Sequence, residues 1–330
     1  FSAMAISATV LTGCIEEIFP ENSTATSEQI GASASALEAA INGLPSQMVQ
    51  GYLVYGRQVR ESDLAYPSLM LVQSELLGDI VATEYGYDWW WRYSANYGMA
   101  DNTYESFLPY FALYKFIKSA NDVIAVVDVT DPTISDEMRG YGSMAHAFRA
   151  LDYYTLMALF EPVENIYTDC SKILGLTVPI VTEATTNDMA KNNPRATREE
   201  MMAFILSDLD KAEIGLADYT PTSKTFPDLS VVYGLKAKVY MWNGEYAKAA
   251  EYARKAIDAS GATPMTAAQW HNPTTGFNAA TSSWMWYFHP TASNMGNLAN
   301  FVGHISGEAD WGYASLSKPQ IARSLYDGIA

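Results

Sequence analysis

The sequence of 330 residues has few cysteines, few histidines and little positive charge. Its two cysteines cannot build a disulfide framework. The 20 Lys and Arg residues are outnumbered by 37 Asp and Glu residues, and the formal net charge of −17 would repel a phosphate backbone. The four histidines show no metal-ligand spacing. The sequence therefore predicts neither a nucleic-acid partner nor a metal site.

Motifs for catalysis are also missing. No G-x-S-x-G elbow and no P-loop string occurs, so we expect no cofactor and no catalytic residue. The acid pair Glu199-Glu200 falls in the first turn of an expected helix, where negative charge suits the helix dipole. Glycoside hydrolysis by two carboxylates stays open as an alternative, because the separation that it requires is spatial.

Long hydrophobic runs are absent. The uncharged residues 1–13 would span only ~20 Å as a helix, which is short of a ~30 Å hydrocarbon core. They lead through Leu11-Thr12-Gly13 into Cys14, a run that resembles a bacterial lipobox. We expect residues 1–13 to be the remnant of a signal peptide, Cys14 to carry the lipid and residues 14–30 to form a polar tether. A buried N-terminal strand ending in an ordinary cysteine is the alternative.

Helical spacing of apolar residues follows. Predicted helices cover Ser35–Leu44, Asn102–Asp128 and Ser135–Phe160, and another begins after Thr197. Ser35 with Glu38, and Thr197 with Glu200, fit capping boxes. Asn121 lies inside an apolar stripe, so we expect its amide to bond a neighbouring backbone segment. Between the later helices, Gly175–Glu183 is β-branched and contains a proline, which predicts an extended irregular segment.

Residues from about 230 to 260 match a tetratricopeptide repeat in their small, aromatic and turn positions. Small residues would let helix Ser230–Trp242 approach helix Glu245–Ser260 across the Asn243-Gly244 turn. One repeat cannot bury its outer face alone, so the earlier helices are expected to be divergent repeats. An unrelated helical hairpin is the alternative. From about 261 to 330 the chain is irregular and aromatic-rich, with Trp284 and Trp286 expected in a short strand and in the core.

The segment Tyr85–Tyr97 concentrates aromatic side chains beside polar ones. Neither helical nor strand period can bury three adjacent indoles on one face, so at least one of them must be partly exposed. A sugar ring offers an apolar C–H face and a hydroxyl rim, which an indole flanked by polar groups matches. The candidate ligand-binding residues are Asp88, Trp89, Trp90, Trp91, Arg92 and Asn96, with Trp311 as a weaker candidate for the opposite wall. Alternatively, all three indoles pack against neighbouring helices.

Six segments in order resemble the SusD/RagB family of outer-membrane nutrient-binding lipoproteins. They are the lipobox with its tether, "ALYKFIKSANDVIAVVD", "AHAFRALDYYTLMALF", "GLTVPIVTE", "TREEMMAFILSDLDKAEIGL" and "VVYGLKAKVYMWNGEYAKAAEYARKAI". The resemblance implies a mainly α, tetratricopeptide-like fold over residues 31–330 that ends early relative to the family. It differs in an insertion before Leu174 that carries Cys170, expected to be half-buried.

The resemblance also implies a function. It implies capture of oligosaccharides at the cell surface, stacking aromatics in the loop before "LYKFIKSAN", and hand-over to a SusC-like TonB-dependent outer-membrane transporter. It further implies localisation at the outer membrane through lipid on Cys14. Two alternatives stay open, namely peptide-nutrient binding within the same family and a tetratricopeptide-type protein-interaction scaffold.

Overall fold

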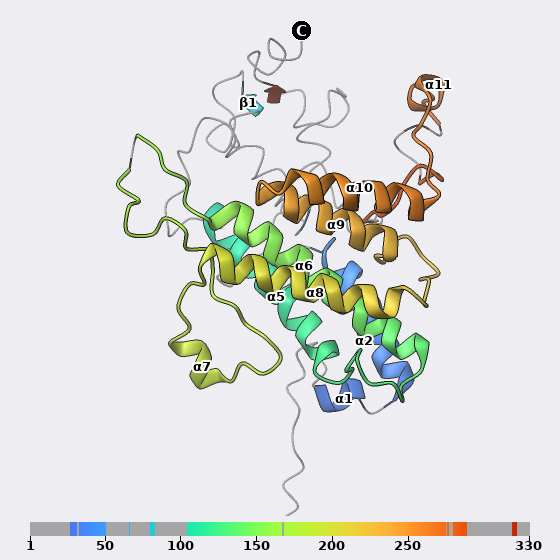
Figure 1. Ribbon diagram of the computed structural model, residues 1–330, viewed down its shortest axis with the longest axis horizontal. Helices are drawn as coiled ribbons and strands as arrows, with labels where there is room; N and C mark the ends of the chain where they lie inside the picture. Colours follow the sequence, from blue (N-terminus) through green and yellow to red (C-terminus); the bar gives the residue numbers. More distant parts are fainter. Residues whose placement is uncertain are drawn as a thin grey trace, which may run out of the picture.

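The computed structural model is built mainly of helices (Figure 1). It describes residues 27–31, 33–50, 66, 80–82, 104–166, 168–274, 276, 280–288 and 319–321. The helices are α1 (Ser27–Gly31), α2 (Ala34–Gln47), α5 (Tyr104–Ile124), α6 (Asp136–Phe160), α7 (Asn187–Lys191), α8 (Arg198–Leu216), α9 (Leu229–Trp242), α10 (Tyr246–Ser260) and α11 (Ala267–Trp270). Strands β1 (Ile80–Ala82) and β2 (Pro319–Ile321) pair antiparallel. The predicted mainly α fold is confirmed.

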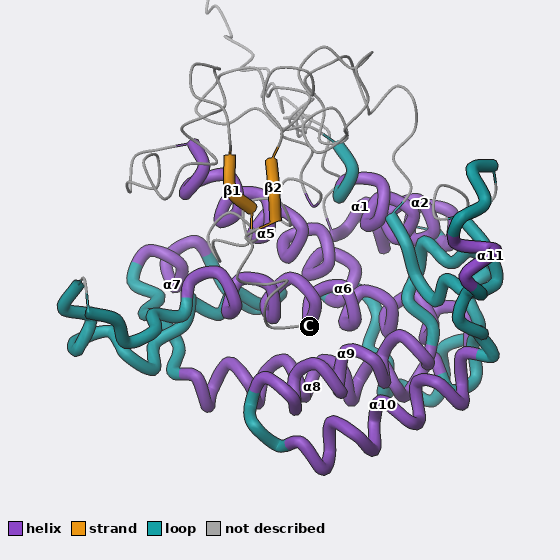
Figure 2. The backbone as a smooth tube through the Cα atoms, turned by 90° about the horizontal axis from the view of Figure 1, so that it is seen from above, coloured by secondary structure: helices purple, strands orange, loops and turns teal. Residues whose placement is uncertain are grey.

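Helix α6 is the centre of the core. It is buried along most of its length and packs against α5 on one side and α8 on the other, while α9 and α10 add an outer hairpin (Figures 1 and 2). Close approach of α8 to α6 depends on Gly215, where a Cβ atom would lie 2.6 Å from the carbonyl oxygen of Arg139. In the part of the chain that the structure describes, no helix is long and apolar enough to cross a bilayer.

Most predicted helix starts are confirmed. Ser135 caps α6 through Met138 N, and Thr197 and Glu200 form the expected capping box of α8. The capping box at Ser35 is wrong, because α2 already begins at Ala34 and Ser35 lies inside its first turn. Ser33 caps the helix instead. Its extended backbone directs the hydroxyl to the amide of Ala36 at 3.1 Å.

The predicted hairpin is confirmed. Helices α9 and α10 pack against each other across a turn in which Gly244 has a φ of 75°. Among the small residues of α10, Ala249 and Ala256 are buried. The segment Gly175–Glu183 is extended and irregular as expected, with a single bridge from Leu176 to Thr197.

The strand expected at Trp284 and Trp286 is wrong, since residues 280–288 have no regular structure. They dock on the loop between α8 and α9. Trp286 Nε1 donates to the carbonyl of Thr225 at 3.0 Å, and Tyr287 N donates to Lys224 at 3.1 Å. Side-chain and loop partners thus replace a neighbouring strand. Trp286 packs against the core as expected, whereas Trp284 pairs with Tyr287, their ring centroids 5.7 Å apart.

Candidate functional site

The ligand-binding residues expected from the sequence lie outside the described residues. These are Asp88, Trp89, Trp90, Trp91, Arg92, Asn96 and Trp311, and the same holds for the lipidation site Cys14. Their roles therefore stay predictions. Two other groups of residues with functional chemistry lie within the described part: a buried ionic network around Arg149 and an exposed apolar surface at one end of the helices.

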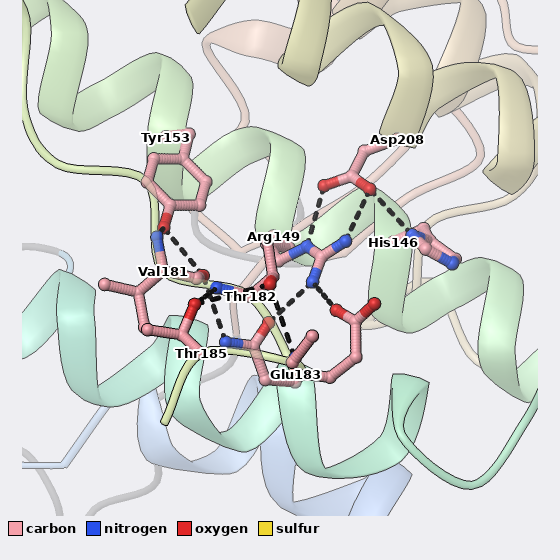
Figure 3. Close-up of polar contacts among 10 residues, drawn as sticks. His146, Arg149, Tyr153, Val181, Thr182, Glu183, Thr185 and Asp208 are labelled. Carbon is pink, nitrogen blue, oxygen red and sulfur yellow. Dashed lines mark hydrogen bonds and ion pairs between the residues drawn. The ribbon is translucent and has the colours of Figure 1, made fainter. Parts of the chain in front are cut away.

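The buried network is centred on the guanidinium of Arg149, which joins three elements to α6 (Figure 3). Its Nε and NH2 atoms donate to the two carboxylate oxygens of Asp208 on α8, each at 2.8 Å. Its NH1 atom donates to Asn121 Oδ1 on α5 at 2.6 Å and to Glu183 Oε2 at 2.6 Å. A planar fork with five donors suits such multiple contacts.

His146 completes the network one turn earlier on α6. Its Nδ1 lies 2.8 Å from Asp208 Oδ1, and both side chains are buried (Figure 3). Burial alone would raise the pKa of Asp208, but hydrogen bonds and charge from Arg149 and His146 lower it below the ordinary value. Burial would likewise raise the pKa of Glu183, but hydrogen bonding and charge from Arg149 lower it below the ordinary value. Both carboxylates are therefore held ionised.

The same network fixes the extended segment that ends at Glu183. Tyr153 exchanges two hydrogen bonds with Val181, and Asn121 Nδ2 donates to the Val181 carbonyl at 3.1 Å. The predicted role of Asn121 as a link to a neighbouring backbone segment is confirmed. Tyr114 adds a bond to the carbonyl of Pro179 at 2.6 Å. These contacts position a loop, and they leave no buried charge of the network without a partner.

Metal chemistry finds no support in this region. Over the described ranges, no three His, Cys, Asp or Glu side chains are grouped in a way that could hold a metal ion. Cys170 is buried, with an exposed fraction of 8%, and its thiol lies 3.6 Å from the carbonyl of Val163. It is therefore an enclosed thiol rather than a reactive one.

The exposed surface lies where α6 and α9 end and where α8 and α10 begin, at the left of Figure 1. Most of the exposed large hydrophobic side chains of the described residues belong to these ends and to the adjoining loops. They are Val163, Ile166, Ile173, Leu174, Met241, Trp242 and Tyr246. The segments that carry them are far apart in sequence, so this surface is a product of the tertiary structure.

The comparison with protein families gives one match. A SusD-like family model, described as "Starch-binding associating with outer membrane", matches residues 46–241, which is more than half of the chain. The chain belongs to this SusD-like family. The matched range includes Tyr85–Tyr97, whereas Cys14, Trp242 and Trp311 lie outside it.

Solved SusD-like structures share the fold. A SusD superfamily protein from Bacteroides thetaiotaomicron is 19% identical, with a TM-score of 0.65 over 89% of this chain and 61% of that one. A putative sugar binding protein from Bacteroides vulgatus is 22% identical, with a TM-score of 0.63 over 89% and 61%. A SusD-like carbohydrate binding protein from Bacteroides fragilis is 16% identical, with a TM-score of 0.64 over 91% and 53%.

The chain spans between about half and three fifths of the length of these solved relatives. No curated protein matches. At such low identity the solved relatives show the fold of this SusD-like protein and do not identify its ligand.

Sequence reasoning missed the ionic network of this SusD-like chain. His146, Arg149 and Tyr153 follow one another at steps of three and four along α6, and Asp208 lies between Ile205 and Leu209 on the buried face of α8. Charged residues at helical spacing within apolar faces were the available signal. Which charge meets which could not be predicted, because the partners are 59 positions apart.

Proposed function

We propose that this SusD-like protein captures oligosaccharides at the outer surface of the outer membrane and hands them to a SusC-like TonB-dependent transporter, without chemical change. The observation that carries the proposal is the match to a family described as starch-binding over a range that contains Tyr85–Tyr97. The solved relatives described as sugar or carbohydrate binding proteins support it as well.

The chemistry of Tyr85–Tyr97 suits a glycan. Trp89, Trp90 and Trp91 are adjacent, so they cannot all be buried on one face of a helix or strand. An exposed indole stacks on the apolar face of a sugar ring, and the hydroxyl rim can bond Asp88, Arg92 and Asn96. Trp311 is our candidate for the opposite wall.

The N-terminal residues would attach the protein to the membrane. Residues 1–13 would be removed as a signal peptide, Cys14 would carry the lipid, and the polar tether after Cys14 would lead into the helical domain, whose first described helix is α1 (Ser27–Gly31). Replacing Cys14 with Ala should then shift the full-length protein from the membrane fraction to the soluble fraction, because a polar tether offers no other apolar anchor. Unchanged membrane association would refute the lipid anchor.

Ligand binding is tested by calorimetry with neutral oligosaccharides, namely maltoheptaose, cellohexaose, xylohexaose and mannohexaose. Loss of one stacking ring should weaken binding about fivefold or more, so we expect at least one of Trp89→Ala, Trp90→Ala and Trp91→Ala to do so. Trp270→Ala is the matched control, because Trp270 is an exposed tryptophan on α11 with an exposed fraction of 54%. Binding of peptides in place of every glycan would favour the peptide-nutrient function.

Hand-over is tested separately from ligand binding. The tethered protein, purified from outer membranes of its host in mild detergent, should carry a TonB-dependent transporter with it. A soluble Cys14→Ala form added back to the same membranes should still bind the transporter, since the tether only raises the local concentration. Failure of both forms to bind any transporter would overturn this part of the proposal.

A further inference from the structure

Trp242 is a half-exposed indole held in a fixed orientation at the end of α9. Its exposed fraction is 38%. Its ring meets that of Tyr154 on α6 nearly at right angles, with centroids 6.1 Å apart. Its Nε1 lies 3.5 Å from Glu161 Oε2, within hydrogen-bond reach. A ring fixed on two sides loses little side-chain entropy when a ligand stacks on it.

Charged groups form a rim beside this indole. Glu161 follows α6, and Arg198 begins α8; Arg198 NH1 lies 2.5 Å from both carboxylate oxygens of Glu161. Arg198 NH2 donates to the carbonyl of Trp242 at 2.9 Å, so one guanidinium links the ends of three helices. The Arg198 side chain has an exposed fraction of 28%, whereas that of Glu161 is 9% exposed, so the guanidinium is the part of the pair nearer to solvent.

We propose that Trp242, with the Glu161–Arg198 pair at its rim, is a second stacking site for one ring of a neutral oligosaccharide. This inference rests on the proposed function and concerns residues outside Tyr85–Tyr97. The chemistry matches a pyranose ring: the indole offers an apolar surface for the C–H bonds and the Arg198 guanidinium a donor for a hydroxyl oxygen. The largely buried carboxylate of Glu161, with an exposed fraction of 9%, holds that guanidinium in place.

The surrounding charge favours a neutral sugar over an acidic one. Glu199 and Glu200 are exposed directly after Arg198, and Glu161 already neutralises the guanidinium. A uronic acid or sulfated sugar would therefore meet net negative charge in a chain whose formal charge is −17. The site is built from the ends of α6, α8 and α9, which are rigidly packed elements rather than loop tips.

A site-specific probe distinguishes this site from the first one. The full chain, labelled with 5-fluorotryptophan, has eight tryptophans, and the fluorine resonance of Trp242 is assigned by its loss in Trp242→Phe. Titration with maltoheptaose, cellohexaose, xylohexaose and mannohexaose should shift the Trp242 resonance saturably for at least one sugar. The resonance of the matched control Trp270 should stay in place.

The variant lacking the first site then separates the two proposals. In Trp89→Ala/Trp90→Ala/Trp91→Ala the Trp242 shift should persist, and adding Trp242→Ala should weaken the remaining binding about fivefold or more. If a sugar shifts other tryptophans but never Trp242, the second site is wrong and the proposed function stands. If none of the sugars shifts any resonance, both proposals fail. An equal shift of the Trp242 and Trp270 resonances would indicate non-specific contact and would overturn the site. A Trp242 resonance that shifts when the transporter is added, but not when a sugar is added, would overturn it as well.

Discussion

Arg149 and Asp208 form a side-on, two-bond ion pair inside the helical core, with both N–O distances at 2.8 Å. Each side chain has an exposed fraction of only 2%. Because water cannot reach either charge, each depends on the other for its solvation. The pair ties α6 to α8, and through Asn121 and Glu183 the same guanidinium reaches α5 and the extended segment.

Removing one partner should therefore destabilise the protein strongly. Asp208→Asn leaves the buried guanidinium with only the partly exposed carboxylate of Glu183, and we expect a loss of about 3–5 kcal/mol in the free energy of unfolding, measured by urea titration. The control is Asp188→Asn, which breaks an exposed pair with Lys191 and should leave the urea midpoint unchanged. Equal effects of both variants would contradict the role assigned to burial.

The loss of stability at low pH should depend on the carboxylate of Asp208. The pKa of Asp208 is lowered in the folded protein, so its contribution is present above the ordinary value near 3.8 and is lost as the pH falls through the folded value. Thermal unfolding followed from pH 5 downward should fall less steeply in Asp208→Asn than in the wild type. Parallel curves would show that Asp208 has no such linkage.

Asp152 should have the opposite pH dependence. It is fully buried on α6, neither carboxylate oxygen has a hydrogen-bond partner in the described structure, and desolvation raises its pKa well above 3.8. The contribution of Asp152 to stability should thus decrease as the pH rises above its unfolded pKa, by at most about 1.4 kcal/mol per pH unit. Asp152→Leu removes this contribution. The free energy of unfolding of the variant, measured by urea titration and compared with that of the wild type, should therefore increase from pH 4 to pH 7. A constant difference would contradict the raised pKa.

Two glycines offer a matched test of helix packing. A Cβ atom at Gly215 would lie 2.4 Å from Ser143 Oγ and 2.6 Å from a backbone carbonyl, so Gly215→Ala should destabilise by about 1–3 kcal/mol. Gly234, inside α9, has nothing within 4 Å of such an atom. Gly234→Ala should stabilise by about 0.5–1 kcal/mol, since alanine favours helix. Calorimetric melting compares the two; destabilisation by Gly234→Ala would contradict this packing.

Tyr153 and Val181 provide a test of how the extended segment is held. The hydroxyl donates to the Val181 carbonyl at 2.9 Å and accepts from the Val181 amide at 2.7 Å. Tyr153→Phe should destabilise by about 1–3 kcal/mol and speed exchange of the Val181 amide hydrogen. Tyr246→Phe, on a tyrosine with an exposed fraction of 71%, is the control and should leave stability and exchange unchanged. Unaltered exchange at Val181 in Tyr153→Phe would show that other contacts hold the segment.

Sequence by itself determined the local features of this protein. Apolar spacing predicted α5 and α6, and the Thr197 capping box predicted the start of α8, because such signals involve residues within a few positions of one another. The hairpin turn at Gly244 followed from the small residues on either side of it. Membership of the SusD-like family was also readable, since its segments occur in order along the chain.

Only the tertiary structure decided which distant residues meet. The sequence could not pair Arg149 with Asp208, nor bring Glu161, Arg198 and Trp242 together, because these contacts join residues 59, 37 and 44 positions apart. His146 lies within the predicted helix Ser135–Phe160, while its carboxylate partner Asp208 could not be predicted. Burial is set by how the helices pack. It makes the Arg149–Asp208 contact necessary, because a charge without a partner in the interior is costly, whereas Trp242 lies at the surface and is partly exposed.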